Sequence, residues 1–404
     1  DQVLLYPANE LIAAEAAVSS PETSALRVDA LLRLAGGFRG IVVVPFAGVR
    51  RYQPERTALL GMTEELRVGQ TVSMEAFLRR LVVLGYERTD RVEQKGQMSV
   101  RGGIVDLFPL TSPFPVRIEW FGDEIDSIRA FDPDEQRSTD RMESFTVTPG
   151  RELVADERRF QNAAQHAFEL LEQQLAKMAD RQAKERLRTE ISREIDLLRQ
   201  HAIFPGLYKY VSLLYPERQT LFDYVPKDAV LVVDEPNRLI ETAKQLERDE
   251  AEWTTQMLMQ GKTLPALALA APIDQALYPK RFQTLYFSLF LRQVPHTQPQ
   301  NIVNFVCRNM QNFHGQMNVL KGEMERWRKN GARIVMLAGS AERAERMRRV
   351  LEDYQIEPPE ILTGNLQNGF ELPSVRLVVV TEGEMFSQKQ RKARRPSRQL
   401  ENAE

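Results

Sequence analysis

The spacing of the apolar residues changes along this chain, and the first change, near Glu64, separates two kinds of structure. Before it, apolar residues recur at helical spacing in Leu11–Ala17 and Ala25–Leu34, which predicts two helices. The continuous apolar run Ile41–Val44 follows and is typical of a parallel strand buried on both faces. With a further strand predicted at Val3–Tyr6, this order of elements favours an open α/β sheet.

After the change, glycine and turn residues bracket short runs in which apolar and polar residues alternate. Met74–Leu84 is predicted to be a helix, and Met98–Phe108, Phe114–Phe121 and Glu124–Phe131 are predicted to be three antiparallel strands. Gly122-Asp123 has the residues of a tight hairpin turn between the last two strands. We therefore expect a small antiparallel α+β module inserted into the α/β domain.

After the module, the spacing of apolar residues again predicts long helical segments and separate strands. An apolar stripe predicts a long helical stretch from about Asp156 to Gln200, and Leu221–Asp234 and Thr284–Leu291 have strand character. The stripe comprises Phe160, Ala163, Ala167, Leu170, Leu171 and Leu175. A strand, helix, strand order then predicts a small α/β domain, and a polar basic stretch after it predicts a flexible linker. These segments are Arg333–Leu337, Ala341–Leu351, Val375–Thr381 and Ser387–Glu404.

A chain of 404 residues is long enough for two to four domains. We place the two parts of the α/β domain at residues 1–65 and 159–330 and the inserted module at residues 66–158. The small domain is expected at residues 331–386 and the linker at residues 387–404.

Composition excludes several classes of protein. Hydrophobic residues make up 43 % and charged residues 27 %, which is typical of a globular chain, and no apolar run approaches the roughly 20 residues of a membrane span. No secretory signal is expected at the beginning, and the single cysteine, Cys307, excludes a disulfide framework, so we expect a cytoplasmic protein. Its 54 basic and 56 acidic residues give no overall basic surface for nucleic acid.

Two glycine-containing segments resemble phosphate or dinucleotide motifs without completing them. A phosphate loop ending in Gly261-Lys262-Thr263 would need a glycine at Gln256 and a strand where Glu252–Met259 has a helical pattern. We therefore expect Gly261 to end a helix. Gly102-Gly103 is not followed by a dinucleotide fingerprint, and predicts a bulge or a close backbone approach in a strand.

Val230–Glu235 has the pattern of a Walker B strand, in which Asp234 would hold magnesium and Glu235 would orient water. Without a phosphate loop these carboxylates have no nucleotide to serve, so we interpret them as a relic or a coincidence. The histidines show no metal-ligand spacing, and we expect neither a catalytic residue nor a metal site. They are His166, His201, His296 and His314.

The strongest physical signal is the alternation in Val116–Phe121. Val116, Ile118 and Trp120 share one face of the strand, and Arg117, Glu119 and Phe121 share the other. If the first face is the core, an arginine and a phenylalanine lie together on the outside, as in the centres of protein–protein interfaces. A second packed face, or a lone exposed aromatic residue, is the alternative, and alternation alone does not separate the two.

The charge of the module favours a protein partner over nucleic acid. Residues 97–140 contain four basic and nine acidic side chains. Because affinity for a phosphate backbone comes from accumulated positive charge, a module with this balance is a poor nucleic-acid binder.

Several strings resemble the UvrB-like region of the bacterial transcription-repair coupling factor family, in the same order along nearly the whole chain. In the module these are Ser99–Pro109, Pro115–Phe121, Asp123–Arg129 and Gln136–Ser138. Outside it they are Leu4–Pro7 with Asn9–Leu11, Phe313–Asn318, Glu323–Trp327, Gly369–Pro373 and Val380–Glu384. UvrB shares the module but not the later strings.

The resemblance implies a non-catalytic recruitment function. In the family, this region is a degenerate helicase-like α/β domain without ATPase activity, with an inserted UvrA-binding domain, followed by a small α/β domain. The family's UvrA-contacting residues fall on Arg101, Arg117 and Phe121, of which Arg101 is added by resemblance alone. RNA polymerase, double-stranded DNA, ATP and magnesium are implied for other domains of the full-length translocase, and a monomer is the expected state.

Three alternatives stay open at this point. The chain could be a UvrB-like helicase subunit of the excision nuclease, or a nucleotide- or DNA-binding fragment, which rests on Val230–Glu235 and the α/β framework. Separately, the basic stretch Lys389–Arg398 could bind DNA weakly. One segment departs from the family, because the chain is shorter between Tyr354 and Gly369. We expect a strand of the small domain to be missing or redrawn there.

Overall fold

The computed structural model describes residues 2–8, 20–135 and 137–386. The chain divides into two compact units, residues 1–296 and 297–404, so the division lies earlier than the predicted boundary at residue 330. The predicted helix at Leu11–Ala17 and the predicted linker at Ser387–Glu404 lie outside the described residues. In the described part of the chain, no helix is long and apolar enough to cross a membrane.

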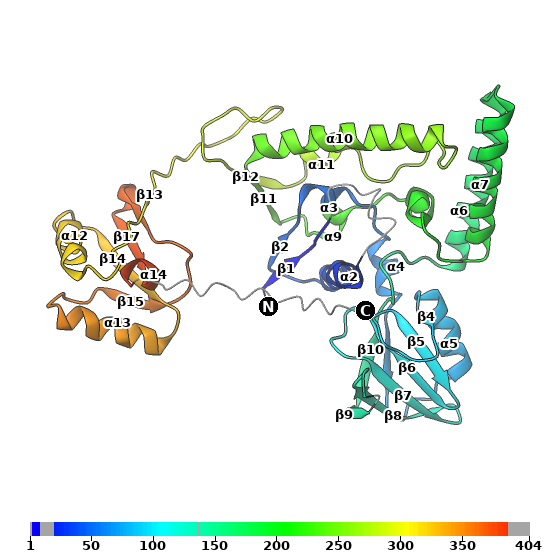
Figure 1. The fold of residues 1–404 in the computed structure, drawn as a ribbon, viewed down its shortest axis with the longest axis horizontal. Helices are drawn as coiled ribbons and strands as arrows, with labels where there is room; N and C mark the ends of the chain where they lie inside the picture. Colours follow the sequence, from blue (N-terminus) through cyan, green and yellow to red (C-terminus); the bar gives the residue numbers. More distant parts are fainter. Residues whose placement is uncertain (1, 9–19, 136, 387–404) are drawn as a thin grey trace, which may run out of the picture. The chain divides into compact units, whose positions relative to one another are not determined.

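The first unit begins with an α/β body, as expected (Figure 1). Strands β1 (Val3–Leu5) and β2 (Ile41–Val43) pair in parallel and are joined by helix α2 (Pro21–Ala35), which ends at Gly36 as the sequence predicts. The prediction that the second strand is buried on both faces is wrong, since Ile41 is 61 % exposed. Its alternate residue, Val42, packs against the core of the body.

A second parallel pair is formed by β11 (Val230–Asp234) and β12 (Gln283–Phe287). The predicted strand Leu221–Asp234 is therefore correct only in its second half. Its first half is the short helix α9 (Leu221–Tyr224), where Thr220 and Asp223 form a reciprocal capping box. The body also contains α3 (Phe46–Arg50), α4 (Arg56–Leu60), η1 (Leu207–Tyr210), α8 (Val211–Leu214) and α11 (Ile273–Leu277).

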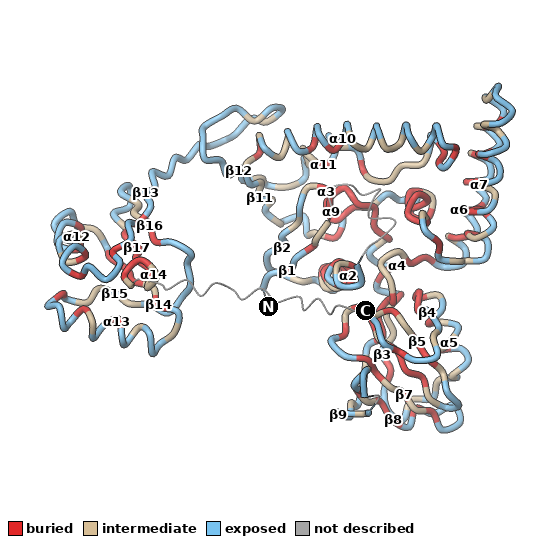
Figure 2. Tube along the Cα trace, in the orientation of Figure 1, coloured by how far each residue is buried: buried red, intermediate tan, exposed pale blue. Residues whose placement is uncertain are grey.

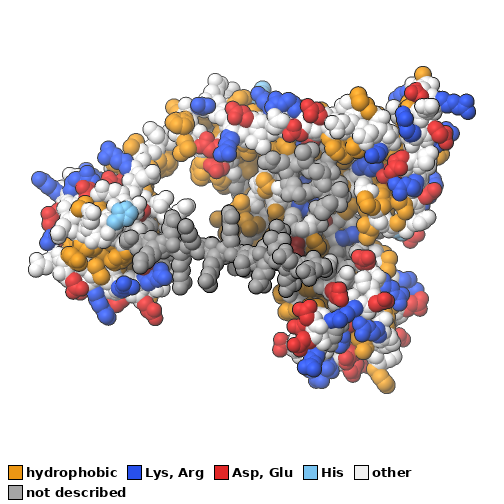
Figure 3. All heavy atoms as spheres, viewed as in Figure 1, with side chains coloured by type: hydrophobic (Ala, Val, Ile, Leu, Met, Phe, Trp, Pro, Cys, Tyr) orange, Lys and Arg blue, Asp and Glu red, His pale blue; other side chains and the backbone are white. Residues whose placement is uncertain are grey.

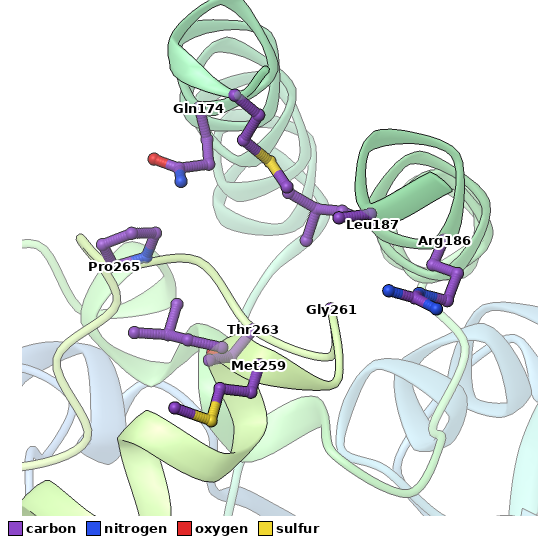
Figure 4. Close-up of a pocket in the computed structure, with 10 residues that line it drawn as sticks. Gln174, Arg186, Leu187, Met259, Gly261, Thr263 and Pro265 are labelled. Atoms are coloured by element: carbon purple, nitrogen blue, oxygen red, sulfur yellow. The ribbon is translucent and has the colours of Figure 1, made fainter. Parts of the chain in front are cut away.

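The glycine-lysine-threonine run does lie after a helix, as expected. Helix α10 (Pro236–Met259) ends there, and Gly261 adopts the left-handed conformation at φ 69°. A side chain at this position would meet the backbone nitrogen of Leu187 at 3.3 Å. Gly261 and Thr263 line a cavity of about 140 Å³ between the end of α10 and two other helices (Figure 4).

Those two helices make up the long helical stretch that the sequence predicts between Asp156 and Gln200. Helix α6 (Glu157–Lys177) and helix α7 (Arg181–Arg199) form a hairpin whose apolar stripes share one core. Asp180 begins the second helix, because its side chain accepts hydrogen bonds from the backbone of Gln182 and Ala183. The fold back at this point lets each stripe bury the other.

The inserted module is a six-stranded sheet in the order β4-β5-β6-β7-β8-β9, covered by helix α5 on one face (Figure 2). The Gly122-Asp123 hairpin is confirmed, with Phe121 paired to Glu124. The strands that lead into and out of the module, β3 and β10, pair antiparallel with each other. Its elements are β3 (Glu64–Arg67), α5 (Met74–Val83), β4 (Glu87–Arg88), β5 (Gln97–Arg101), β6 (Ile104–Leu107), β7 (Val116–Phe121), β8 (Glu124–Phe131), β9 (Ser138–Met142) and β10 (Ser144–Val147).

A buried ionic bridge fixes the returning chain of the module to the body. Glu152, just after β10, accepts hydrogen bonds from Arg27 Nε at 2.9 Å and from Arg51 Nη2 at 2.9 Å. The side chains of Arg27 and Arg51 are 0 % and 5 % exposed, respectively. Because one arginine lies on α2 and the other follows α3, a single carboxylate connects three separate segments.

The second unit is a five-stranded sheet in the order β13-β16-β17-β14-β15. The predicted strand, helix, strand unit is confirmed, since β14 and β17 pair in parallel with α13 between them in sequence. A strand is expected to be missing or redrawn between Tyr354 and Gly369, and it is not missing, because β15 lies there and pairs with β14. The elements are β13 (Arg308–Asn309), α12 (Met317–Lys329), β14 (Arg333–Ala338), α13 (Ala341–Asp353), β15 (Glu360–Thr363), β16 (Phe370–Leu372), η2 (Pro373–Val375), β17 (Leu377–Thr381) and α14 (Glu382–Met385).

Replacing Glu152 by glutamine should reduce the free energy of unfolding by roughly 3 kcal/mol, because it removes the negative charge that bridges two buried guanidinium groups. Urea unfolding followed by circular dichroism measures the change. Glu143→Gln, at an exposed position of the same module, is the matched control. A loss below about 1 kcal/mol for Glu152→Gln would show that the bridge is not a major constraint.

Candidate functional site

The two faces of β7 differ as the alternation predicts. Val116 and Ile118 are 0 % exposed and Trp120 is 8 % exposed, and all three belong to the core of the module. The indole Nε1 of Trp120 donates to the carbonyl oxygen of Val72 at 2.9 Å, which satisfies its buried polar atom. Phe121, the next residue, is 84 % exposed. The interpretation of a second packed face is therefore wrong at this residue.

Arg117 is held rigidly on the outer face by contacts within the module. Its Nε and Nη2 donate to the two carboxylate oxygens of Asp106 on β6, at 2.7 and 2.8 Å. The guanidinium also lies over the ring of Phe131, 5.0 Å from the ring centroid. The hydrogen bond with Asp106 raises the pKa of Arg117, so this side chain is charged at any physiological pH. A two-point contact of this kind fixes the orientation of the group as well as its position.

Strand register extends this polar arrangement across the sheet. Arg117 pairs with Arg129 on β8, and Arg129 pairs with Arg141 on β9. Glu119 lies 3.7 Å from Arg129 and accepts a hydrogen bond from Ser127 at 2.7 Å. Basic and acidic side chains are interspersed over the module in the space-filling view (Figure 3). The outer face is therefore a mixed-charge surface with one large exposed aromatic residue at its end.

Arg101 and Phe121 lie at the same end of the sheet. The predicted strand Met98–Phe108 is two strands, β5 and β6, because Gly102-Gly103 forms the hairpin turn between them, with φ 58° at Gly102. The predicted close approach is also present, since a Cβ on Gly103 would lie 2.9 Å from the carbonyl oxygen of Trp120. Strands β5 and β7 run in the same direction, so their last residues, Arg101 and Phe121, are both beside hairpin tips.

Arg101 differs from Arg117 in having no acidic partner among the described residues. It is exposed, and its Nη2 donates to the backbone carbonyl of Asp90 at 3.2 Å. The charge of Arg101 is therefore available to a partner. The charge of Arg117, in contrast, is already paired with Asp106. The sequence alone does not predict a role for Asp106, Arg129 or Phe131, because their contacts with Arg117 and Glu119 depend on strand register.

The Walker B-like carboxylates, Asp234 and Glu235, belong to the α/β body and not to the module. Asp234 ends β11 and is exposed, and Glu235 begins α10 with φ 49°. Glu235 Oε1 accepts a hydrogen bond from the backbone nitrogen of Leu289 at 2.7 Å, so this carboxylate holds a loop. Within the described residues, no group of three or more histidine, cysteine, aspartate or glutamate side chains has a geometry that could hold a metal ion.

Comparison with known proteins shows which sequences this chain resembles. Residues 65–153 match the UvrB interaction domain, which is the inserted module that carries Arg101, Arg117 and Phe121. Over its whole length the chain is 41 % identical to the transcription-repair-coupling factor of Bacillus subtilis, across 416 aligned residues. Over its whole length the chain is similar to transcription-repair-coupling factors.

Two further relatives are less similar in sequence but align just as completely with the chain. The transcription-repair-coupling factors of Staphylococcus haemolyticus and Staphylococcus aureus are each 31 % identical and cover 100 % of the chain. In all three cases the alignment covers 35 % of the relative, so the chain spans about a third of the length of the family members it matches. The inserted module is the part of the chain that matches the UvrB interaction domain.

Truncation of Phe121 and of its neighbour Trp120 should have very different effects on the free energy of unfolding. Phe121→Ala should change the free energy of unfolding by less than about 0.5 kcal/mol, because the ring is already in water. Trp120→Ala should reduce it by about 3–5 kcal/mol, because it leaves a cavity in the core of the module. Thermal and urea unfolding of both variants test this, and a destabilised Phe121→Ala would show that the ring is packed in solution.

Proposed function

We propose that the module binds UvrA through Arg101, Arg117 and Phe121, and so brings nucleotide excision repair to stalled RNA polymerase. The observation that carries this proposal is the combination of an immobilised arginine and an 84 % exposed phenylalanine on one strand of a UvrB interaction domain. Rigid side chains lose little conformational freedom on binding, which favours a preformed site.

The three residues would contribute in different ways. Burial of the Phe121 ring in an apolar pocket of the partner would stabilise the complex by roughly 1.5–3 kcal/mol. Arg101 would pair with a carboxylate on the partner, since it has none among the described residues. Arg117 would donate through the nitrogen positions that Asp106 leaves available, in a direction that Asp106 fixes.

The remaining activities belong to the whole family protein. We propose that the full-length protein is a cytoplasmic, ATP-dependent translocase that moves on double-stranded DNA and displaces RNA polymerase. In this proposal ATP and magnesium bind domains outside the 404 residues, and the chain described here acts as a monomeric recruitment module without catalysis of its own.

Titration of purified UvrA with the chain tests the interface. Phe121→Ala should weaken binding by roughly 30- to 700-fold, the effect of losing about 2–4 kcal/mol at a central interface residue. Arg101→Glu should also abolish most of the binding, because it reverses an accessible charge. Arg188→Glu, at an exposed position of helix α7 outside the module, is the control and should bind like the wild type.

At Arg117 the choice of variant matters. Arg117→Glu would put a second carboxylate beside Asp106 and disturb the sheet, so a loss of binding would have two explanations. Arg117→Lys keeps the charge and removes the two-point contact, and should weaken binding without unfolding the module. If folded Phe121→Ala and Arg101→Glu variants bind UvrA as the wild type does, the proposed interface is wrong.

A titration with magnesium and ATP tests the assignment of nucleotide binding to other domains. We expect no saturable binding by this chain, because Gln256 replaces the required glycine and the Glu235 carboxylate is bound to a backbone amide. Saturable binding that Asp234→Asn removes would instead show that the body keeps a working nucleotide site.

A further inference from the structure

A second candidate site lies where the returning chain of the module meets the body. It is a cavity of about 200 Å³ within the first unit. Aromatic and aliphatic side chains form much of its wall, namely Tyr52, Leu153, Ile203, Phe204, Leu207 and Tyr215. Its polar lining includes Gln53, Arg51, Arg151 and a single carboxylate, Glu152. The cavity is large enough for a small ion and has two guanidinium groups in its wall.

Arg151 is the unusual member of this lining. Its Nε and Nη1 are shielded from solvent and have no hydrogen-bond partner in the described part of the chain. Burial lowers the pKa of Arg151 to about 10, although the group stays protonated at neutral pH. A desolvated cation without hydrogen-bond acceptors is destabilising, unless another group supplies the missing negative charge.

The position of this guanidinium is fixed by the backbone next to it. The side chain of Arg151 packs directly against Gly85, where a Cβ would lie 2.3 Å from Nε. Gly85 has φ 86°, so a larger residue is disfavoured there for conformational reasons too. Arg151 is thus held in place although no acid among the described residues pairs with it.

The neighbouring carboxylate, Glu152, already has hydrogen-bond partners. Both of its oxygens accept hydrogen bonds, one from Arg27 and the other from Arg51. No other aspartate or glutamate among the described residues lines the cavity. No carboxylate in the lining is therefore available to pair with Arg151.

We propose that the cavity binds a small oxyanion, inorganic phosphate or a carboxylate, with Arg151 as its principal ligand. A guanidinium presents parallel N–H groups that match two oxygens of either anion. The Gln53 side chain, buried at the same cavity, is a further polar neighbour of the site. The bound anion would neutralise Arg151 and strengthen the junction between the module and the body.

Thermal unfolding of the chain in phosphate, in acetate and in chloride at constant ionic strength tests the site. Phosphate or acetate should raise the melting temperature by about 2 °C when the free anion is roughly five times its Kd. Arg151→Gln should lose this response and should be at least as stable as the wild type in chloride, because it removes a buried unpaired charge. Arg141→Gln, which removes an exposed arginine of the same module, should keep the response.

The comparison of phosphate with acetate identifies which oxyanion the cavity prefers, and a response to either one that depends on Arg151 supports the proposal. An equal melting temperature in all three salts would overturn it, as would an unchanged response in folded Arg151→Gln. If Arg151→Gln does not fold, Arg151→Lys replaces it. This variant keeps the charge but not the parallel donors, and must bind the anion at least tenfold more weakly for the proposal to stand.

Discussion

The carboxylate of Glu152 is the constraint on which the first unit depends. It lies between two guanidinium groups that are almost completely buried, one on α2 and one after α3, and it follows β10 on the returning chain of the module. Charges removed from water stabilise a fold only when each is paired in good geometry. The bridge therefore favours one arrangement of the module's returning chain on the body, and the sheet that carries Phe121 is built outward from this point.

Much of the module was predictable because its signals are local. The alternation in Val116–Phe121 requires no knowledge of the rest of the chain, since successive side chains of a strand must point to opposite faces. The turn at Gly122-Asp123 is local for the same reason. In contrast, the partner of Arg117 is Asp106, eleven residues away on another strand. Only the register of β6 against β7 brings them together, and a sequence does not state a register directly.

The body was harder to predict, and its errors have identifiable causes. The pattern between residues 156 and 200 indicated helix but did not locate the fold back at Asp180, since the apolar stripe from Phe160 to Leu175 lies entirely within α6. Thr220 and Asp223 have the spacing of a capping box, which could have predicted helix α9. The apolar residues Leu221 and Phe222 favoured a strand instead. For β2, a run of apolar residues predicted burial on both faces, but burial depends on neighbours that the run itself does not specify.

The pairing of β3 with β10 has a consequence for how this architecture is inherited. The chain leaves the body and returns to it at adjacent positions, so the whole of residues 64–147 occupies the place of a short loop. The entropy of closing such an insertion rises only slowly with its length, and the host sheet need not change to accept it. A domain connected in this way can be transferred from one host domain to another without any change in the sheet of the host.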